Sequence, residues 1–341
     1  MSQQDVAEVK SWIRRESLVA SIIKLPGDAS TRMYFRVITK DGQSYIVMKM
    51  EPFKETAKEL PFIIVQKHLY QVGVQVPEIL DIDSANGFLL LEDLGDITLL
   101  RKLQEVDDVS IETMLFKKVI DELIKMQVFA SPDRARTKID AFKLKFDFEK
   151  LFWEVNFTIE QFYELHLKRE IKEAEKKLMH TQLGQICQVL ADEPVVFTHR
   201  DFHSRNLMVA ADSGLFERLV MIDFQDARMG PPQYDLASLL RDSYYQLSEK
   251  QIQNLLGYYM DQYEKVSGTK LDREHFIKIF DFMSIQRNFK AIGSFASFEN
   301  KRGNSTYLKY IGNTFENIRR NLLKYPEYSK LREVLFHYYY F

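Results

Sequence analysis

The chain has 341 residues, with 47 Lys and Arg residues against 49 Asp and Glu residues, and a formal net charge of −2 at pH 7. The chain is longer than a single compact domain usually is, so we expect two lobes. The near-neutral charge argues against general binding to nucleic acid or to acidic membranes, and favours a small-molecule partner. No stretch of the sequence approaches the roughly 20 apolar residues that cross a bilayer.

The single cysteine, Cys187, has no partner for an internal disulfide, which is typical of a reducing compartment. It lies in an apolar, helix-like stretch from Leu183 to Leu190, so we interpret it as a core residue. The N-terminal segment is charged throughout. We therefore expect a cytoplasmic protein, and we expect it to act as a monomer.

Strand patterns dominate the chain up to residue 94. The expected elements are a helix over 3–16, strands near 21–25 and over 33–39, 44–50, 76–82 and 87–94, and a helix from Pro61 to Gly73. Beyond residue 94 the apolar residues recur at helical spacing, as in the series Leu115, Val119, Leu123 and Met126. The sequence thus predicts a β-rich first part and a mostly helical remainder.

An unusually polar loop, within "FTHRDFHSRNLMV" at 197–209, lies between two apolar runs. The segment after it reads as a hairpin, and an antiparallel pairing of Leu207 with Ile222 would set Asn206 opposite Asp223. With Asp201 just before this hairpin, three side-chain oxygens would converge. Such a set suits Mg²⁺, whereas the alternative is that the two residues only cap the ribbon.

The series His199-x-Asp201-x-x-x-x-Asn206, followed by "IDFQD" at 222–226, resembles the catalytic loop and metal-binding segment of the aminoglycoside phosphotransferase and choline kinase family. The resemblance implies an α+β, two-lobed, protein-kinase-like fold. A β-rich nucleotide-binding lobe would cover 1–94, and a mostly helical lobe for catalysis and acceptor binding would cover 95–341.

The same resemblance implies the roles of the polar residues. Asp201 would be the catalytic base that orients the attacking hydroxyl, and Asn206 and Asp223 would hold Mg²⁺ against the phosphates of ATP. Asp235, at an expected helix start, would steady the catalytic loop through backbone N–H groups.

In the first lobe the resemblance implies a set of nucleotide-binding residues: Ser30 and Thr31 in a phosphate-covering loop, Lys49 at the α- and β-phosphates, and Glu92 and Asp93 at the hinge to the adenine. Without the resemblance, Lys49 reads equally as a lysine that reaches solvent from a strand end. The helix after Pro61 carries no glutamate, so Glu59 is our choice as the partner of Lys49, with Gln66 as the alternative.

Five blocks of the sequence are similar to the bacterial kinases that phosphorylate the anomeric hydroxyl of N-acetylmuramate and N-acetylglucosamine in peptidoglycan recycling: "DASTRMYFRV", "GFLLLEDLGD", "HRDFHSRNLM", "IDFQDARMGPPQYDLASLLRD" and "QRNFKAIGSF". This similarity implies that the chain uses ATP to make the 1-phosphate of an amino sugar. The candidate residues for acceptor binding are His203, Ser204, Arg205 and Arg287, and Lys290 follows in the last block.

Three other functions are compatible with the sequence. A kinase of the same fold would act on an aminoglycoside, an amino alcohol or another sugar. A metal-dependent hydrolase would use the alternating His199, Asp201 and His203 as ligands of a transition metal. A catalytically silent nucleotide-binding module would account for the missing helix glutamate.

Overall fold

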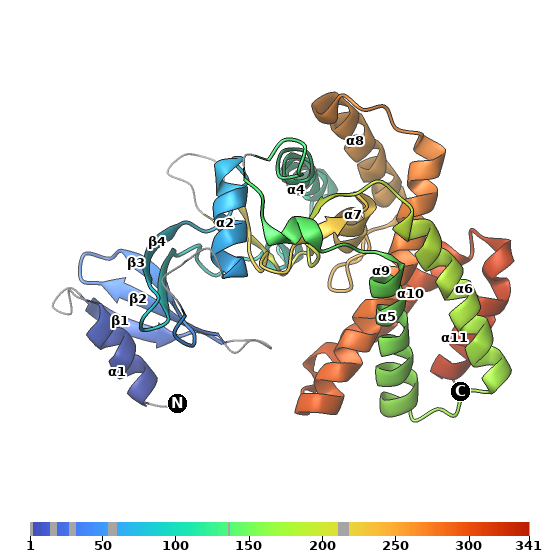
Figure 1. Ribbon diagram of the computed structural model, residues 1–341, viewed down its shortest axis with the longest axis horizontal. Coiled ribbons are helices and arrows are strands. Elements are labelled where there is room, and N and C mark those ends of the chain that lie inside the picture. Colours follow the sequence, from blue (N-terminus) through green and yellow to red (C-terminus); the bar gives the residue numbers. More distant parts are fainter. Residues whose placement is uncertain are drawn as a thin grey trace. The chain divides into compact units, whose positions relative to one another are not determined.

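The computed structural model describes residues 3–13, 19–26, 32–53, 60–135, 137–210 and 218–340. The chain forms two compact units. The first consists of Met1–Ile97 with Met208–Gln225, and the second of Thr98–Leu207 with Asp226–Phe341 (Figure 1). The division expected at residues 94 and 95 lies close to the break after Ile97. The segment Met208–Gln225 groups with the first unit, although it follows the second unit's polar loop in the chain.

The first unit contains a five-stranded antiparallel sheet with the order β1-β2-β3-β5-β4. Its strands are β1 (Val19–Lys24), β2 (Met33–Thr39), β3 (Ser44–Lys49), β4 (Ile79–Asp83) and β5 (Phe88–Glu92). The alternation of the sequence explains the sheet, since odd-numbered Phe35, Val37 and Val47 are buried on one face. The expected five strands and the α+β fold are confirmed.

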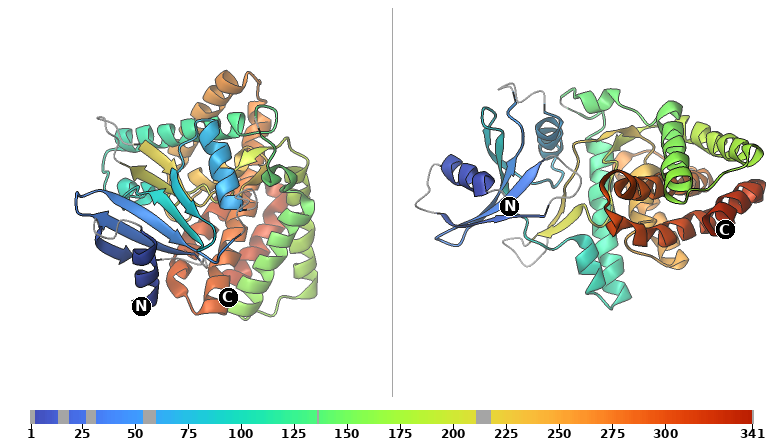
Figure 2. Two further views of the ribbon diagram at one scale, coloured as in Figure 1. Left: turned by 60° about the vertical axis from the view of Figure 1, so that its left-hand side comes forward. Right: turned by 90° about the horizontal axis from the view of Figure 1, so that it is seen from below.

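Two helices of this unit lie on opposite sides of the sheet (Figures 1 and 2). Helix α1 (Gln3–Trp12) packs Val9 into the cluster of Phe35, Val37 and Val47. Helix α2 (Pro61–Gln71) begins at Pro61, as expected, because proline suits the first helical position. The chain leaves α2 through Gly73, whose φ of +77° favours glycine. The expected first helix extended to residue 16, and residues 14–18 lie outside the described part.

The expected hairpin after the polar loop is present as two strands that pair with each other, β7 (Leu207–Ala210) and β8 (Arg218–Met221). Residues 211–217, which include the expected turn, lie outside the described part. The pairing of Asn206 with Asp223 therefore stays a prediction.

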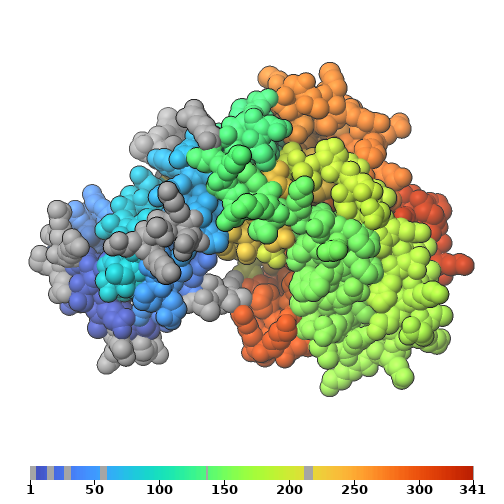
Figure 3. All heavy atoms as spheres, in the orientation of Figure 1, coloured from blue at the N-terminus to red at the C-terminus, as the bar shows by residue number. Residues whose placement is uncertain are grey.

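The second unit is mostly helical, as expected. Its helices are α3 (Leu99–Gln104), α4 (Val109–Phe129), α5 (Phe148–Thr158), the π-helical continuation η3 (Ile159–His166), α6 (Glu173–Ala191), α7 (Gln233–Leu240), α8 (Glu249–Ser267), α9 (Arg273–Arg302), α10 (Ile311–Leu322) and α11 (Ser329–Tyr340), with short 3₁₀ turns η2 (Asp140–Lys143), η4 (Ser305–Tyr310) and η5 (Pro326–Tyr328). The strands β6 (Val196–Thr198) and β9 (Arg228–Gly230) pair with each other. Helix α9 is the central element, because it packs against α5, α7 and α10. The side chains of α5 and α6 form a broad surface of this unit (Figure 3).

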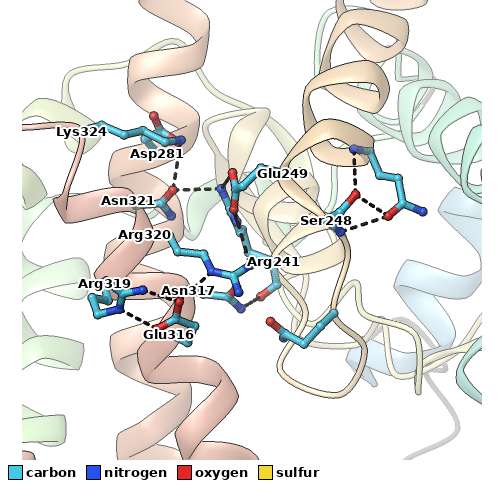
Figure 4. A network of polar contacts seen from close by, with 12 residues as sticks. Arg241, Ser248, Glu249, Asp281, Glu316, Asn317, Arg319, Arg320, Asn321 and Lys324 are labelled. Carbon is cyan, nitrogen blue, oxygen red and sulfur yellow. Dashed lines mark hydrogen bonds and ion pairs between the residues drawn. The ribbon is translucent and has the colours of Figure 1, made fainter.

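A buried polar network fixes the end of α7 (Figure 4). The Arg241 side chain is buried, and its guanidinium donates to Glu249 Oε2 at 2.8 Å and to Asn321 Oδ1 at 3.2 Å. The amide of Asn317 donates in turn to the Arg241 carbonyl at 3.1 Å. Because α8 and α10 supply these partners, the chain that follows α7 has a fixed position.

Cys187 is fully buried in α6, and burial raises the pKa of its thiol to about 12. This confirms its interpretation as a core residue. Within the described ranges, none of the helices is both long enough and apolar enough to cross a membrane.

Candidate active site

The polar loop begins where β6 ends, and its first residues are held in an uncommon backbone conformation. Arg200 has a φ of +83°, in the left-handed region that non-glycine residues seldom adopt. Both oxygens of Asp235 accept backbone N–H groups here, from His199 at 2.7 Å and from Arg200 at 3.0 Å. The expected support of the loop by Asp235 is therefore confirmed. A backbone conformation of this kind persists where surrounding contacts hold it in place. Here the Asp235 carboxylate supplies those contacts.

A second buried carboxylate, Asp242, holds the middle of the loop. Its Oδ2 accepts the backbone N–H of Ser204 at 2.9 Å, and Leu100 of α3 donates to the Ser204 carbonyl at 3.0 Å. The Asn206 amide donates to the carbonyl of Asp201 at 2.9 Å and closes the loop. Sequence reasoning missed Asp242, although an Arg–Asp pair directly after the apolar run of α7 was a usable signal.

The carboxylate of Asp201 lies next to cations from α9. Its Oδ1 is 3.4 Å from Lys290 Nζ and 4.0 Å from an Arg287 nitrogen. Burial by itself raises the pKa of Asp201, but Lys290, Arg200 and Arg287 together lower it far more, so the pKa lies well below its ordinary value. Asp201 therefore stays ionised at neutral pH. Lys290 is closer to it than Arg287, the candidate that the sequence favoured.

The candidate acceptor residues occupy distinct surroundings. Burial, reinforced by Arg287, lowers the pKa of His203 to about 3, so this ring is neutral, and it packs edge-on against Tyr244 at a centroid distance of 5.1 Å. The Arg205 guanidinium lies 5.1 Å from the ring of Tyr244 and 5.1 Å from that of Tyr307. Two cation–π contacts thus hold the Arg205 side chain against these two rings.

Asp223 follows β8 in the first unit, with a φ of +66°. The Gln225 amide donates a hydrogen bond to Asp223 Oδ1 at 2.6 Å. Phe224, the residue after Asp223, stacks on Phe62 of α2 at a centroid distance of 5.0 Å. These contacts fix the segment that carries the carboxylate. Among the residues that the structure describes, no three His, Cys, Asp or Glu side chains gather as a metal-binding group.

Lys49 has partners other than those expected. Its ammonium lies 2.9 Å from Asp5 Oδ1 and 2.6 Å from Glu8 Oε2, both on α1. Gln66 does not face it, because the Gln66 amide donates to the Pro77 carbonyl at 2.8 Å. That alternative is therefore wrong, since the two side chains belong to opposite faces of the sheet. Glu59, our first choice as the partner of Lys49, lies outside the described residues. The candidates of the phosphate-covering loop, Ser30 and Thr31, also lie outside them.

The two hinge candidates are both engaged in ion pairs of the first unit. Both carboxylate oxygens of Asp93 accept hydrogen bonds from the Arg36 guanidinium, at 2.6 and 3.0 Å. Glu92 forms an ion pair with Arg218. These side chains anchor the end of β5, so any contact with an adenine would come from the backbone. Their role at the nucleotide stays a prediction.

The sheet with its helix, the helical unit and the ionised aspartate in a braced loop define a phosphotransferase of the kinase type. The chain belongs to the phosphotransferase enzyme family, whose model matches residues 21–268. It is 32% identical over 326 residues to the N-acetylmuramate/N-acetylglucosamine kinase of Pseudomonas aeruginosa, which covers 93% of this chain and 88% of the relative. It is 30% identical over 310 residues to the enzyme of the same name from Neisseria meningitidis serogroup B, with coverages of 90% and 87%.

Solved structures share the fold at lower sequence identity. The choline kinase LicA from Streptococcus pneumoniae superposes with a TM-score of 0.59 at 18% identity, over 92% of this chain and 99% of that one. An ADP-bound aminoglycoside phosphotransferase gives a TM-score of 0.57 at 14% identity, over 93% and 98%. These matches establish the common fold of the family.

Proposed function

We propose that the chain transfers the γ-phosphoryl group of ATP to the anomeric hydroxyl of N-acetylmuramate, N-acetylglucosamine or both, and so makes the sugar 1-phosphate for peptidoglycan recycling. The observation that carries the phosphoryl transfer is the ionised Asp201, braced by Asp235 and flanked by Lys290. The choice of acceptor is supported by the names of the relatives and by the matches, which cover 90% and 93% of this chain.

In this proposal Asp201 orients the sugar hydroxyl for attack on the γ-phosphorus. The new bond forms between the sugar oxygen and phosphorus, the bond to the ADP oxygen breaks, and the hydroxyl proton passes to Asp201. A carboxylate with a lowered pKa is a weak base, but phosphoryl transfer has a loose transition state in which positioning matters more than proton abstraction. Lys290 and Arg287 would offset the negative charge of the transferred group.

The amide of Asn206 and the carboxylate of Asp223 are proposed to hold Mg²⁺ with the ATP phosphates. The chemistry of these side chains fits, because Mg²⁺ prefers oxygen ligands and takes few of them from protein when phosphates are present. The bound metal would neutralise charge on the phosphates. Gln225 would keep Asp223 in place through the hydrogen bond described above.

The charges beside Asp201 favour a neutral or anionic acceptor. Three cationic side chains, Lys290, Arg287 and Arg205, belong to the loop and α9 around it. A polycationic aminoglycoside would meet like charge there, whereas the lactyl carboxylate of N-acetylmuramate would find guanidinium partners. His203 and Ser204 would then contact the sugar from the same loop. The cytoplasmic location and the monomeric state stay predictions.

A purified-protein assay tests this proposal. The protein is incubated with Mg²⁺, ATP and one acceptor at a time, with N-acetylmuramate, N-acetylglucosamine, kanamycin and choline as the acceptors, and NMR locates the new phosphate. We expect phosphate on C1 of an amino sugar, and we expect Asp201→Asn to lower kcat about 100-fold or more with ATP binding retained. Asp140→Asn is the control, because that side chain is 80% exposed. Phosphate on C6, or turnover of only kanamycin or choline, would contradict the proposed acceptor.

A further inference from the structure

The two faces of the sheet in the first unit differ in the charges that they present, and strand β3 shows this directly. Val47 and Lys49 share the face that α1 covers: Val47 packs in the cluster of Val9, and Lys49 is held by Asp5 and Glu8. Two carboxylates thus neutralise the ammonium. Lys49 is committed to α1, on the side of the sheet away from α2.

The other face of β3 carries no charge at the corresponding position. Met48 is fully buried there, and its partner across the β2–β3 pair is Tyr34. Opposed residues of an antiparallel pair point to the same face, so Tyr34 lies on the α2 side with Met48. A nucleotide that binds on this side therefore meets a methionine where a lysine was expected.

A cation that does lie on the α2 side is Arg32, directly after the predicted phosphate-covering loop. Its guanidinium carbon is 5.6 Å from the ring centroid of Phe62 in α2. Phe62 stacks in turn on Phe224, the residue after the predicted metal ligand Asp223. Arg32 and Asp223 therefore flank one aromatic pair within the first unit.

The hydroxyl of Tyr34 interacts with the charges of both Arg32 and Asp223. Burial raises its pKa, while the charge and a side-chain hydrogen bond of Arg32 lower it and the charge of Asp223 raises it again. Tyr34 thus lies within electrostatic reach of the cation and the carboxylate. Arg36, an arginine of β2 on this face, is held by Asp93 in a two-point ion pair and also binds Asp96.

We propose that Arg32, and not Lys49, is the residue of the first unit that binds the phosphates of the nucleotide. This inference rests on the proposed kinase function. A guanidinium presents a planar fork of N–H donors that matches phosphate oxygens, so Arg32 can take the place of a strand lysine. Lys49 then has a structural role, because it ties α1 to the sheet.

The experiment measures nucleotide binding directly, by calorimetry of the full-length protein with Mg-ATP, Mg-ADP and adenosine. We expect Arg32→Ala to weaken the binding of ATP and ADP about 10-fold or more, since charge-assisted hydrogen bonds are lost, and to leave adenosine binding unchanged. The ATP affinity of Arg32→Lys should lie between those of the wild type and Arg32→Ala. Lys49→Met should lower the melting temperature and have little effect on ATP affinity. Lys67→Ala, an exposed lysine of α2, is the matched control.

Two results would overturn the assignment of Arg32. One is an Arg32→Ala variant that binds ATP within about twofold of the wild type. The other is a Lys49→Met variant that loses more ATP affinity than Arg32→Ala while it still binds adenosine. These measurements contain no acceptor sugar, so the inference stands if ATP binds but no amino sugar is phosphorylated. A wild-type protein that binds no nucleotide would refute both this inference and the proposed function.

Discussion

The carboxylate of Asp235, in the first turn of α7, accepts the backbone N–H of His199 at 2.7 Å, across 36 positions of the chain. Its other oxygen accepts the N–H of Arg200, the residue with positive φ that directly precedes Asp201. The position of the proposed catalytic carboxylate therefore depends on α7, a helix outside the loop. Burial raises the pKa of Asp235 to about 7, although these two hydrogen bonds favour its ionised form.

We expect Asp235→Asn to change how stability depends on pH. A buried acid with a raised pKa binds its proton more tightly in the folded state, so stability falls as pH rises from about 4 to about 7. The amide does not titrate, and the variant should show a flatter decline over this range in urea unfolding. Asp140→Asn should leave the slope as it is. An unchanged slope in Asp235→Asn would show that Asp235 is already ionised at pH 5.

Removal of the ammonium next to Asp201 should impair the reaction. In Lys290→Met the burial of Asp201 is opposed by fewer cations, so the pKa of Asp201 should rise toward its ordinary value. We expect kcat to fall about 100-fold, the typical cost of one stabilising donor. Lys290→Arg should recover part of it. Lys278→Met, at an exposed lysine of the same helix, should have wild-type kinetics, and a wild-type kcat in Lys290→Met would contradict this role of Lys290.

His203 should contribute stability that acid removes. Its folded-state pKa is about 3, against 6.5 for an ordinary histidine, so the unfolded chain binds a proton first as pH falls below about 6.5. Stability is therefore lost between about pH 6.5 and pH 3. His203→Gln should lose less stability than the wild type between pH 7 and pH 5, as measured by urea unfolding. His275→Gln, at a half-exposed histidine, is the control, and equal losses in all three proteins would contradict the assignment.

Two glycines of long helices should respond in opposite directions to alanine. A Cβ at Gly293 of α9 would lie 2.7 Å from the Cα of Thr158, where α5 approaches closely, so Gly293→Ala should destabilise by about 1–3 kcal/mol. A Cβ at Gly257 of α8 meets no atom within 4 Å, so Gly257→Ala should stabilise by about 0.5–1 kcal/mol. Thermal unfolding of both variants checks this contrast. Equal effects would show that α9 can shift away from Thr158.

Local patterns were enough to predict most elements of the first unit. The hairpin of β2 and β3 follows from alternation and a turn, and α2 begins at its proline, because these features depend on neighbouring residues. The support of the loop by Asp235 was also predicted, but through the family resemblance. No short-range pattern connects Asp235 with His199.

Contacts between distant segments were beyond such patterns. Lys290 reaches Asp201 across 89 positions, and Asp242 reaches Ser204 across 38, because the packing of α7 and α9 brings them together. Asp242 was missed, and Lys290 was ranked below Arg287, for this reason. Helical spacing predicts that a helix forms and which side is apolar, but it does not determine which partner that side meets.

Lys49 shows the division most clearly. Alternation in β3 established from the sequence that Lys49 shares a face with Val47 and that Met48 faces the other way. Only the tertiary structure decided that α1 covers the face of Lys49 and that α2 covers the face of Met48. The physical reason is that both faces of this sheet carry buried apolar side chains, so either could receive either helix. The side of the sheet on which a charge lies is settled by packing between segments that are far apart in the chain.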